Sequence, residues 1–250
     1  MIKHRQFLLL TLFCISGTSA LAADSFVVTN DGRRLDADAI RADSQGTLEV
    51  RIGGATQTLR RGNYRTVSTP KPKPVELLEK AATQGRYDIV RDKAPEVFDA
   101  YRYLGWGGYI ATRHGQAYLE NNNPERALQI FNQGDDYAEL QVNEEEQTAL
   151  LNKGKAEALL DLGRTEQALG ILKNLKTAGN DELAAFAFNA AGRLLAQQGK
   201  KKEAVLEYLK TVLLFEPGNV QRERSEAKEQ VVKLLKEMGD PRYEKFQSME

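Results

Sequence analysis

The sequence has 250 residues, of which 41% are hydrophobic and 28% are charged, a composition typical of a folded globular protein. Its 35 basic and 35 acidic side chains argue against nucleic acid as the partner, because no basic excess is available to neutralise phosphates. The single cysteine, Cys14, lies near the N-terminus, so the rest of the chain has no thiol for a disulfide, a zinc–cysteine site or a cysteine nucleophile.

The N-terminal segment is predicted to be a secretory signal peptide. Lys3 and Arg5 form a positive start, residues 7–15 form an apolar run, and Ala20-Leu21-Ala22 offers small residues where a signal peptidase cleaves. We expect cleavage after Ala22 and export to the periplasm or the medium. The alternative is a membrane anchor, but the apolar run is shorter than the roughly 20 residues that span a bilayer. No later segment is apolar enough to be a transmembrane helix.

Residues 23–69 are predicted to form a small β module, a meander or incomplete barrel. The stretch "TLEVRI" alternates apolar and polar residues as a half-buried strand does, and Asn30-Asp31-Gly32 and Gly53-Gly54 are turn signals. The segment resembles small β-barrel modules that precede helical repeats in some bacterial envelope proteins. The expected strands cover residues 26–29, 34–40, 47–52, 56–59 and 64–67. Alternating prolines then favour an extended linker at residues 70–74.

Residues 75–250 are predicted to be helical and repetitive. Residues that can close a helix in the left-handed conformation recur at intervals of 37, 41, 36 and 40 residues. These expected helix ends are Gly85, Asn122, Gly163, Gly199 and Gly239. A recurrence in this range is typical of stacked repeats.

Each of the three central units has two small residues twelve positions apart, on either side of the break. The pairs are Gly115 with Ala127, Ala156 with Ala168, and Gly192 with Ala204. Small side chains at these positions allow two antiparallel helices to approach closely. Larger residues four positions after each second small residue are expected to fill the remaining space, and they are Phe131, Leu172 and Tyr208.

The stretches "RHGQAYLENNNPERALQIF", "KAEALLDLGRTEQALGIL" and "AAGRLLAQQGKKKEAVLEYLKTVLLFEPGN" resemble the tetratricopeptide repeat (TPR) family over residues 109–219. The spacing exceeds the family's repeat length, and a terminal proline occurs only at Pro217. The flanking units lack the small pair and are interpreted as degenerate end repeats whose outer faces meet water. The expected fold class is therefore mainly α, a TPR-like solenoid of antiparallel helix pairs after an all-β module.

The resemblance implies that the first helix of each pair lines a concave face that binds an extended peptide or a helix of a partner. Position by position, it assigns to this face Tyr109, Thr112 and Gln116, then Lys153 and Glu157, then Phe186, Asn189, Arg193 and Gln197.

The segment "HGQAYLENNNPERALQIF" raises the question of a catalytic loop, because His114 is the only histidine after the signal peptide. No second histidine or cysteine is available to share a metal, so we expect a plain surface histidine. Asn123 and Pro124 instead predict a helix start, with Asn123 as the N-cap. "LGWGGYI" does not fit the G-x-G-x-x-G spacing of a nucleotide-binding loop and is interpreted as a turn between repeats.

No catalytic residue, cofactor site or metal site is assigned, and an enzyme is the least favoured class. The leading hypothesis is an exported adaptor or scaffold that binds a partner protein or peptide in the cell envelope. The alternative is a structural envelope protein that assembles with itself or with the cell wall and has no peptide-binding groove.

Overall fold

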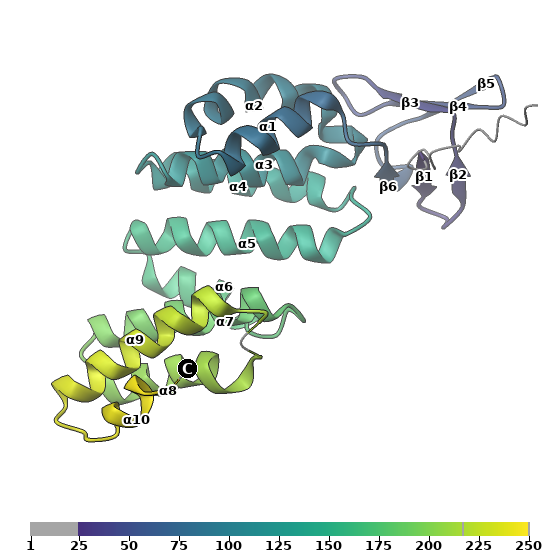
Figure 1. Cartoon of the computed structure of the whole chain (residues 1–250). Helices are drawn as coiled ribbons and strands as arrows, with labels where there is room; N and C mark the ends of the chain where they lie inside the picture. Colours follow the sequence, from purple (N-terminus) through teal and green to yellow (C-terminus); the bar gives the residue numbers. More distant parts are fainter. Residues whose placement is uncertain (1–24, 217, 250) are drawn as a thin grey trace, which may run out of the picture.

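The computed structural model describes residues 25–216 and 218–249, which form a small β module followed by a long array of α-helices (Figure 1). This architecture confirms the predicted fold class. The expected signal peptide, residues 1–22, lies outside the described residues.

The β module consists of two three-stranded antiparallel sheets, with strand orders β2-β1-β6 and β3-β4-β5. Its strands are β1 (Phe26–Thr29), β2 (Arg34–Asp36), β3 (Ala39–Ala42), β4 (Leu48–Ile52), β5 (Ala55–Leu59) and β6 (Tyr64–Ser68).

The expectation of one strand over residues 34–40 is wrong, because β2 and β3 belong to different sheets. The chain changes sheet at two residues: the Ala37 amide donates to the Ser25 carbonyl (2.8 Å) and the Asp38 amide donates to the Arg51 carbonyl (2.8 Å). No glycine or proline marks this corner in the sequence, so the local pattern could not reveal it.

A compact apolar core supports the module. Val27, Leu48 and Val50 have no exposed surface, and Tyr64 is buried beside them. The Tyr64 hydroxyl donates to the Gly46 carbonyl (2.6 Å), and burial raises the pKa of this phenol to about 12. The tyrosine therefore contributes both apolar area and one satisfied polar contact to the core.

Helices make up the rest of the described chain. They are α1 (Lys73–Thr83), α2 (Tyr87–Tyr101), a π-helical turn η1 (Arg102–Trp106), α3 (Gly107–Leu119), α4 (Pro124–Ala138), α5 (Glu144–Asp161), α6 (Thr165–Leu175), α7 (Asp181–Gln197), α8 (Lys201–Leu214), α9 (Gln221–Glu237) and α10 (Tyr243–Gln247). Helix α1 begins inside the proline-rich stretch, two residues before Val75, because proline is tolerated in the first turn of a helix.

The predicted helix ends are confirmed. All five break residues have positive φ, from 53° at Asn122 to 76° at Gly199. Asn123 caps α4 as predicted, its side-chain oxygen accepting from the Arg126 amide at 3.1 Å, and Pro124 is the first residue of α4. The stretch around His114 is therefore an elbow between two helices.

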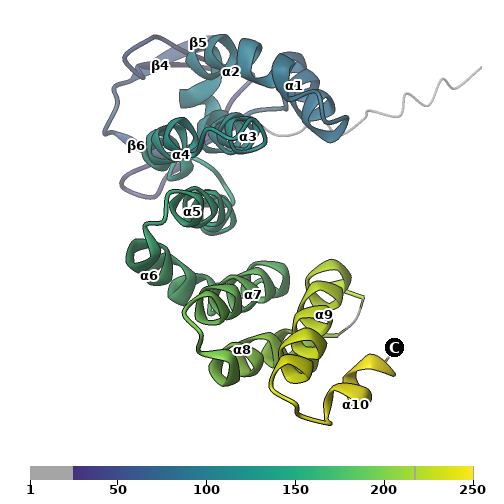
Figure 2. The same ribbon diagram turned by 90° about the vertical axis from the view of Figure 1, so that its left-hand side faces the viewer.

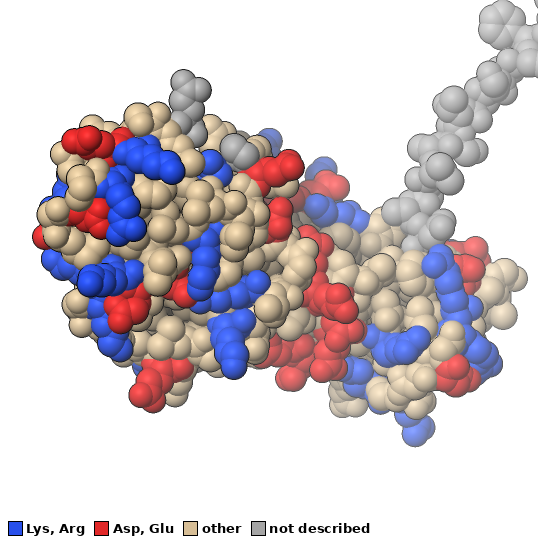
Figure 3. Space-filling view, turned by 90° about the horizontal axis from the view of Figure 1, so that it is seen from below, with Lys and Arg blue, Asp and Glu red and all other residues tan. Residues whose placement is uncertain are grey.

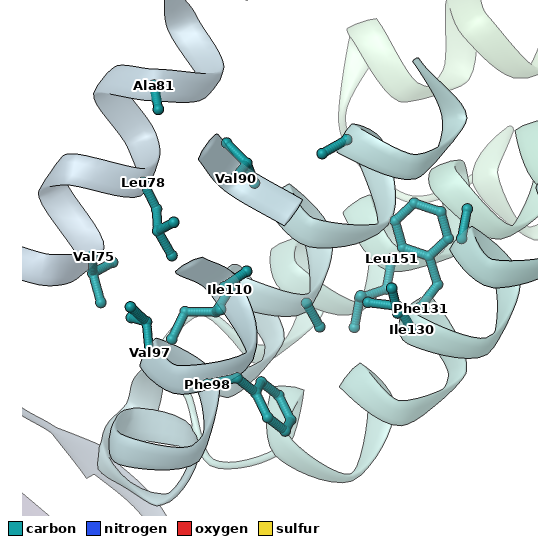
Figure 4. Packing of buried hydrophobic residues seen from close by; sticks show 14 of the residues in the cluster. Val75, Leu78, Ala81, Val90, Val97, Phe98, Ile110, Ile130, Phe131 and Leu151 are labelled. Atoms are coloured by element: carbon teal, nitrogen blue, oxygen red, sulfur yellow. The ribbon is translucent and has the colours of Figure 1, made fainter. Parts of the chain in front are cut away.

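The predicted small residues are buried where the helices cross. Ala127, Ala156, Ala168 and Ala204 have no exposed surface. The ring of Phe131 on α4 lies directly against Gly115 on α3 and Gly154 on α5, so a Cβ at either glycine would overlap it. Figure 4 shows Phe131 in a cluster that continues through Val75, Val90, Ile110 and Leu151, so one core links α1 to α5.

The helix pairs stack into a curved superhelix (Figure 2). Contacts join α1 to α3, α3 to α5, α5 to α7 and α7 to α9, so the first helices of the pairs form a continuous row. In Figure 2 this row lies on the inner side of the curve, and α4, α6 and α8 lie on the outer side. The row is therefore the surface to which the TPR resemblance assigns the binding residues.

The β module is joined to the helices at the glycine-rich segment. Gly105 in η1 has a φ of +82°, and a Cβ there would overlap the Val67 carbonyl oxygen of β6. The Val67 amide donates to the carbonyl of Leu140, two residues after the end of α4, at 2.8 Å, and Leu140 is buried in the β core. The segment "LGWGGYI" connects two helix pairs as expected, and strand β6 packs against it.

Candidate binding surface on the concave face

Helix α3 places Tyr109, Thr112 and Gln116 on one side, because residues three and four apart share a helix face. The Thr112 hydroxyl donates to the Gly108 carbonyl (2.9 Å) and accepts from the Gln147 amide group (2.6 Å), so it already has two partners. The Gln116 amide donates to Glu120 at 3.1 Å. Tyr109 is thus the main apolar group that α3 offers to a ligand.

Tyr109 belongs to an aromatic cluster at the N-terminal end of the row, formed with Trp106, Arg113, Lys71 and Glu79. The rings of Trp106 and Tyr109 meet edge to face at 6.0 Å, and the Arg113 guanidinium lies 5.0 Å from the Tyr109 ring. Lys71 lies 5.5 Å from the same ring and pairs with Glu79 at 2.8 Å. Burial raises the pKa of the half-buried Tyr109 phenol. This aromatic cluster is a partly exposed group of rings beside cations.

Helix α5 places a carboxylate without a partner in the middle of the row. Glu157 is half-buried, and burial raises the pKa of its carboxyl group. Lys153 and Arg222 lower that pKa through their charges, whereas Asp161 and Glu120 raise it. Glu157 forms no hydrogen bond or ion pair with any residue that the structure describes.

Lys153 and Phe186 lie beside this carboxylate on neighbouring helices. The Lys153 ammonium is 5.2 Å from the centre of the Phe186 ring and 3.8 Å from a Glu182 carboxylate oxygen. The lysine thus bridges α5 and α7 with a cation–π contact and a long ion pair. Lys153 and Phe186, which the sequence assigns to the concave face, therefore contact each other between α5 and α7.

The prediction that Asn189 is a binding residue is corrected by the structure, because Asn189 is not on the accessible part of the concave face. It is only 2% exposed, and its amide donates to the Glu223 carbonyl of α9 at 2.8 Å. Helix α9 covers it, an arrangement that the repeat pattern did not show because the last unit lacks the small pair. Its Oδ1 atom has no hydrogen-bond partner among the described residues.

The remaining α7 residues stay accessible. The Arg193 guanidinium pairs with Glu226 of α9 at 2.9 Å, and about half of each side chain is exposed. Gln197 is exposed near the C-terminal end of α7. Arg193 is therefore a structural contact between α7 and α9 as well as a group that a ligand can reach.

Sequence reasoning did not assign several residues of this surface. They are Lys71, Glu79, Arg113, Glu120, Asp161, Arg222 and Glu226. Arg113 and Glu120 lie four residues after Tyr109 and Gln116, and this spacing could have indicated them. Arg222 and Glu226 belong to α9, which only the tertiary structure brings to the row.

The expectation of a surface His114 is wrong. His114 is only 8% exposed, and the centre of its ring lies 5.3 Å from the centre of the Tyr118 ring. Burial lowers the pKa of the imidazole to about 4, and the charge of Arg126 adds to this effect. Within residues 25–216 and 218–249, no group of three or more His, Cys, Asp or Glu side chains is placed to hold a metal ion.

No protein-family model matches the sequence, and a comparison with curated proteins likewise gives no match. Among the described helices, none combines the length and the apolar character that crossing a membrane requires.

Proposed function

We propose that the chain is an exported adaptor of the TPR type, whose concave face binds a segment of a partner protein. The observation that carries the proposal is Glu157, a half-buried carboxylate without a partner at the centre of the row of first helices. A charge held in this way is unfavourable in the free protein, and a cation from a ligand relieves the penalty.

The groups around Glu157 define the chemistry of the bound segment. The segment presents a lysine or arginine to Glu157, because this carboxylate has no hydrogen bond or ion pair of its own within the described chain, and the charges of Asp161 and Glu120 beside it oppose those of Lys153 and Arg222. An apolar or aromatic side chain of the segment packs on the aromatic cluster, where Trp106 and Tyr109 are the residue types that dominate binding energy at interfaces. Lys153 and Arg193 bind carboxylates or carbonyl groups of the same segment.

The test is affinity capture from cell-envelope extract with the chain lacking residues 1–22, followed by titration of the recovered partner. Glu157→Gln removes the charge and keeps the shape, so binding is expected to weaken by about tenfold, equivalent to one lost charge pair. The matched control is Glu229→Gln, at an exposed position of α9. Equal binding by wild type and Glu157→Gln would overturn the proposed centre of the site.

A second variant tests Arg193 without breaking the contact between α7 and α9. The double substitution Arg193→Glu with Glu226→Arg retains an ion pair at this place and exchanges the positions of its charges. Together with Lys153→Glu, it is expected to weaken binding of the same partner. If Lys153→Glu alone and the triple variant both bind as wild type does, the α5–α7 part of the face is not used.

The alternative function is self-assembly or association with the cell wall, with an empty concave face. The observation on its side is the exposure of leucines at the two ends of the solenoid, 57% for Leu77 and 60% for Leu206, although basic side chains surround both of them. Light scattering and sedimentation with peptidoglycan test this candidate, which predicts oligomers or co-sedimentation that Glu157→Gln does not change.

A further inference from the structure

An apolar groove lies between α1 and α2, at the end of the solenoid beyond which Figures 1 and 2 show no further helix. It has a volume of about 680 Å³. Leu77, Leu78, Ile89 and Val97 line it, and Leu77 is 57% exposed. The outer face of the first pair, which is expected to meet water, therefore exposes an apolar trough.

The rim of this groove is basic. Lys80, Arg86 and Lys93 line it, against one carboxylate, Glu96. The ion pairs that involve α1 and α2 join Lys71 to Glu79 and Arg102 to Asp99. The three rim cations thus have no carboxylate partner in the described part of the chain, and they favour an acidic ligand.

The shape of the groove favours a helix as the occupant. Within the chain, α5 packs across α3 and α4, and α9 packs across α7 and α8. Helix α3 packs in the same way across the inner side of α1 and α2, and the groove on their outer side has the same two-helix shape, into which a third helix can pack. Helix α1 has 11 residues, or about 16 Å at 1.5 Å per residue, so the groove accommodates about three turns of a ligand helix.

We propose that the α1–α2 groove docks an amphipathic helix of a partner protein, with apolar side chains along one stripe and carboxylates beside that stripe. This surface is separate from the concave face, and the proposal does not depend on Glu157. The leucine-lined trough takes the stripe, and Lys80, Arg86 and Lys93 pair with the flanking carboxylates.

Charge argues against a second copy of the chain as the occupant. The groove at the other end of the solenoid, lined by Leu206, is also basic, with Lys202, Arg242 and Lys245 against Asp240. Figure 3 shows basic side chains on this C-terminal end, which faces the viewer, with acidic side chains among them. End-to-end stacking, or pairing of two α1–α2 grooves, would bring like charges together.

The experiment uses two labelled helical peptides of about 15 residues with the same leucine stripe, one flanked by glutamates and the other by lysines. Binding to the chain lacking residues 1–22 is measured by fluorescence anisotropy in about 0.15 M NaCl. The glutamate peptide is expected to bind at least about tenfold more tightly than the lysine peptide. Lys80→Glu with Lys93→Glu is expected to reverse this preference.

Single substitutions on three surfaces identify where the glutamate peptide binds. Leu77→Glu is expected to remove binding of the glutamate peptide, and it leaves the fold intact because Leu77 is exposed; a thermal melt checks this. Leu206→Glu at the other end and Glu157→Gln on the concave face are expected to bind the peptide as wild type does.

Several outcomes would overturn the proposal. They are equal affinity for the two peptides, retention of binding by Leu77→Glu, and a dimer of the wild-type chain that Leu77→Glu dissolves, which would assign the groove to a second copy. Binding of anionic lipid vesicles through Leu77 without binding of the glutamate peptide would also overturn it.

Discussion

At the scale of single residues, glycines in the first helices act as contact surfaces for aromatic rings. Phe131 is held between Gly115 and Gly154, and the Tyr208 ring lies against Gly192, where a Cβ would sit 3.0 Å from the ring. The twelve-residue spacing predicted these crossings. It did not include Gly154, which belongs to the next unit and is placed against Phe131 only by the stacking of pairs.

Substitution of Gly115 tests this packing. Gly115→Ala adds a methyl group that overlaps the Phe131 ring, so we expect a net loss of roughly 1–2 kcal/mol of unfolding free energy despite the better helix propensity of alanine. The matched control is Gly170→Ala in the middle of α6, where the added methyl meets open space. The control is expected to gain up to about 1 kcal/mol in denaturant unfolding. Equal effects of the two changes would refute the contact.

His114 gives the protein a specific response to acid. Because its pKa is about 4 in the folded protein and 6.5 in the reference state, the unfolded chain takes up the proton first as the pH falls. Stability is therefore unaffected well above pH 6.5 and declines between that value and about pH 4.

The variant His114→Gln, which does not titrate, isolates this effect. Between about pH 7.5 and pH 5, wild type is expected to lose roughly 2 kcal/mol more unfolding free energy than the variant does. Urea unfolding at the two pH values measures the difference. Parallel losses in the two proteins would show that His114 is already protonated, or accessible to water, in the folded state.

At the scale of elements, the sequence predicted the helix ends, the Asn123 cap and the crossings within each helix pair, but not the contacts between more distant elements. The left-handed helix ends and the Asn123 cap depend on local backbone geometry, so the sequence predicted them. The corner between β2 and β3, the burial of His114 and the covering of Asn189 by α9 depend on residues distant in sequence. Periodicity has no information on which neighbour covers a given face.

The packing of β6 against η1 is a contact between distant residues that a substitution can test. Gly105→Ala is expected to loosen the β module, because the methyl overlaps the Val67 carbonyl and alanine is also strained at a φ of +82°. Gly85→Ala is the matched control, with a φ of +69° and open space around the added methyl. Hydrogen exchange at the Val67 amide is expected to quicken in Gly105→Ala only. Unchanged exchange there would contradict the docking.

At the scale of the whole molecule, the row of first helices and the α1–α2 groove are two surfaces with different chemistry. The row combines rings, cations and an unpaired carboxylate, whereas the groove is apolar with a basic rim. The β module shares its core with Leu140, next to α4, so it is held against the N-terminal part of the solenoid. The two proposals together predict that the chain holds two partner segments at once, one on each surface.

The sequence predicted the solenoid and, through the TPR resemblance, the first helices as its inner surface. Eight of the nine assigned residues lie there with some exposed surface, and Asn189 is the exception. The surroundings of the Glu157 carboxylate could not be predicted, because Glu120, just after α3, and Arg222 of α9 are distant from it in sequence. The curvature of the superhelix brings these charges together.

The most direct test of the concave face is site-specific photo-crosslinking in the native cell, with a photoreactive residue in place of one glutamine at a time. Gln116 and Gln197 lie on the first helices, whereas Gln129 and Gln167 are exposed on the second helices. The account predicts one common partner crosslinked from Gln116 and Gln197 and absent from Gln129 and Gln167. Crosslinks to the same partner from the second helices alone, or equally from all four positions, would contradict it.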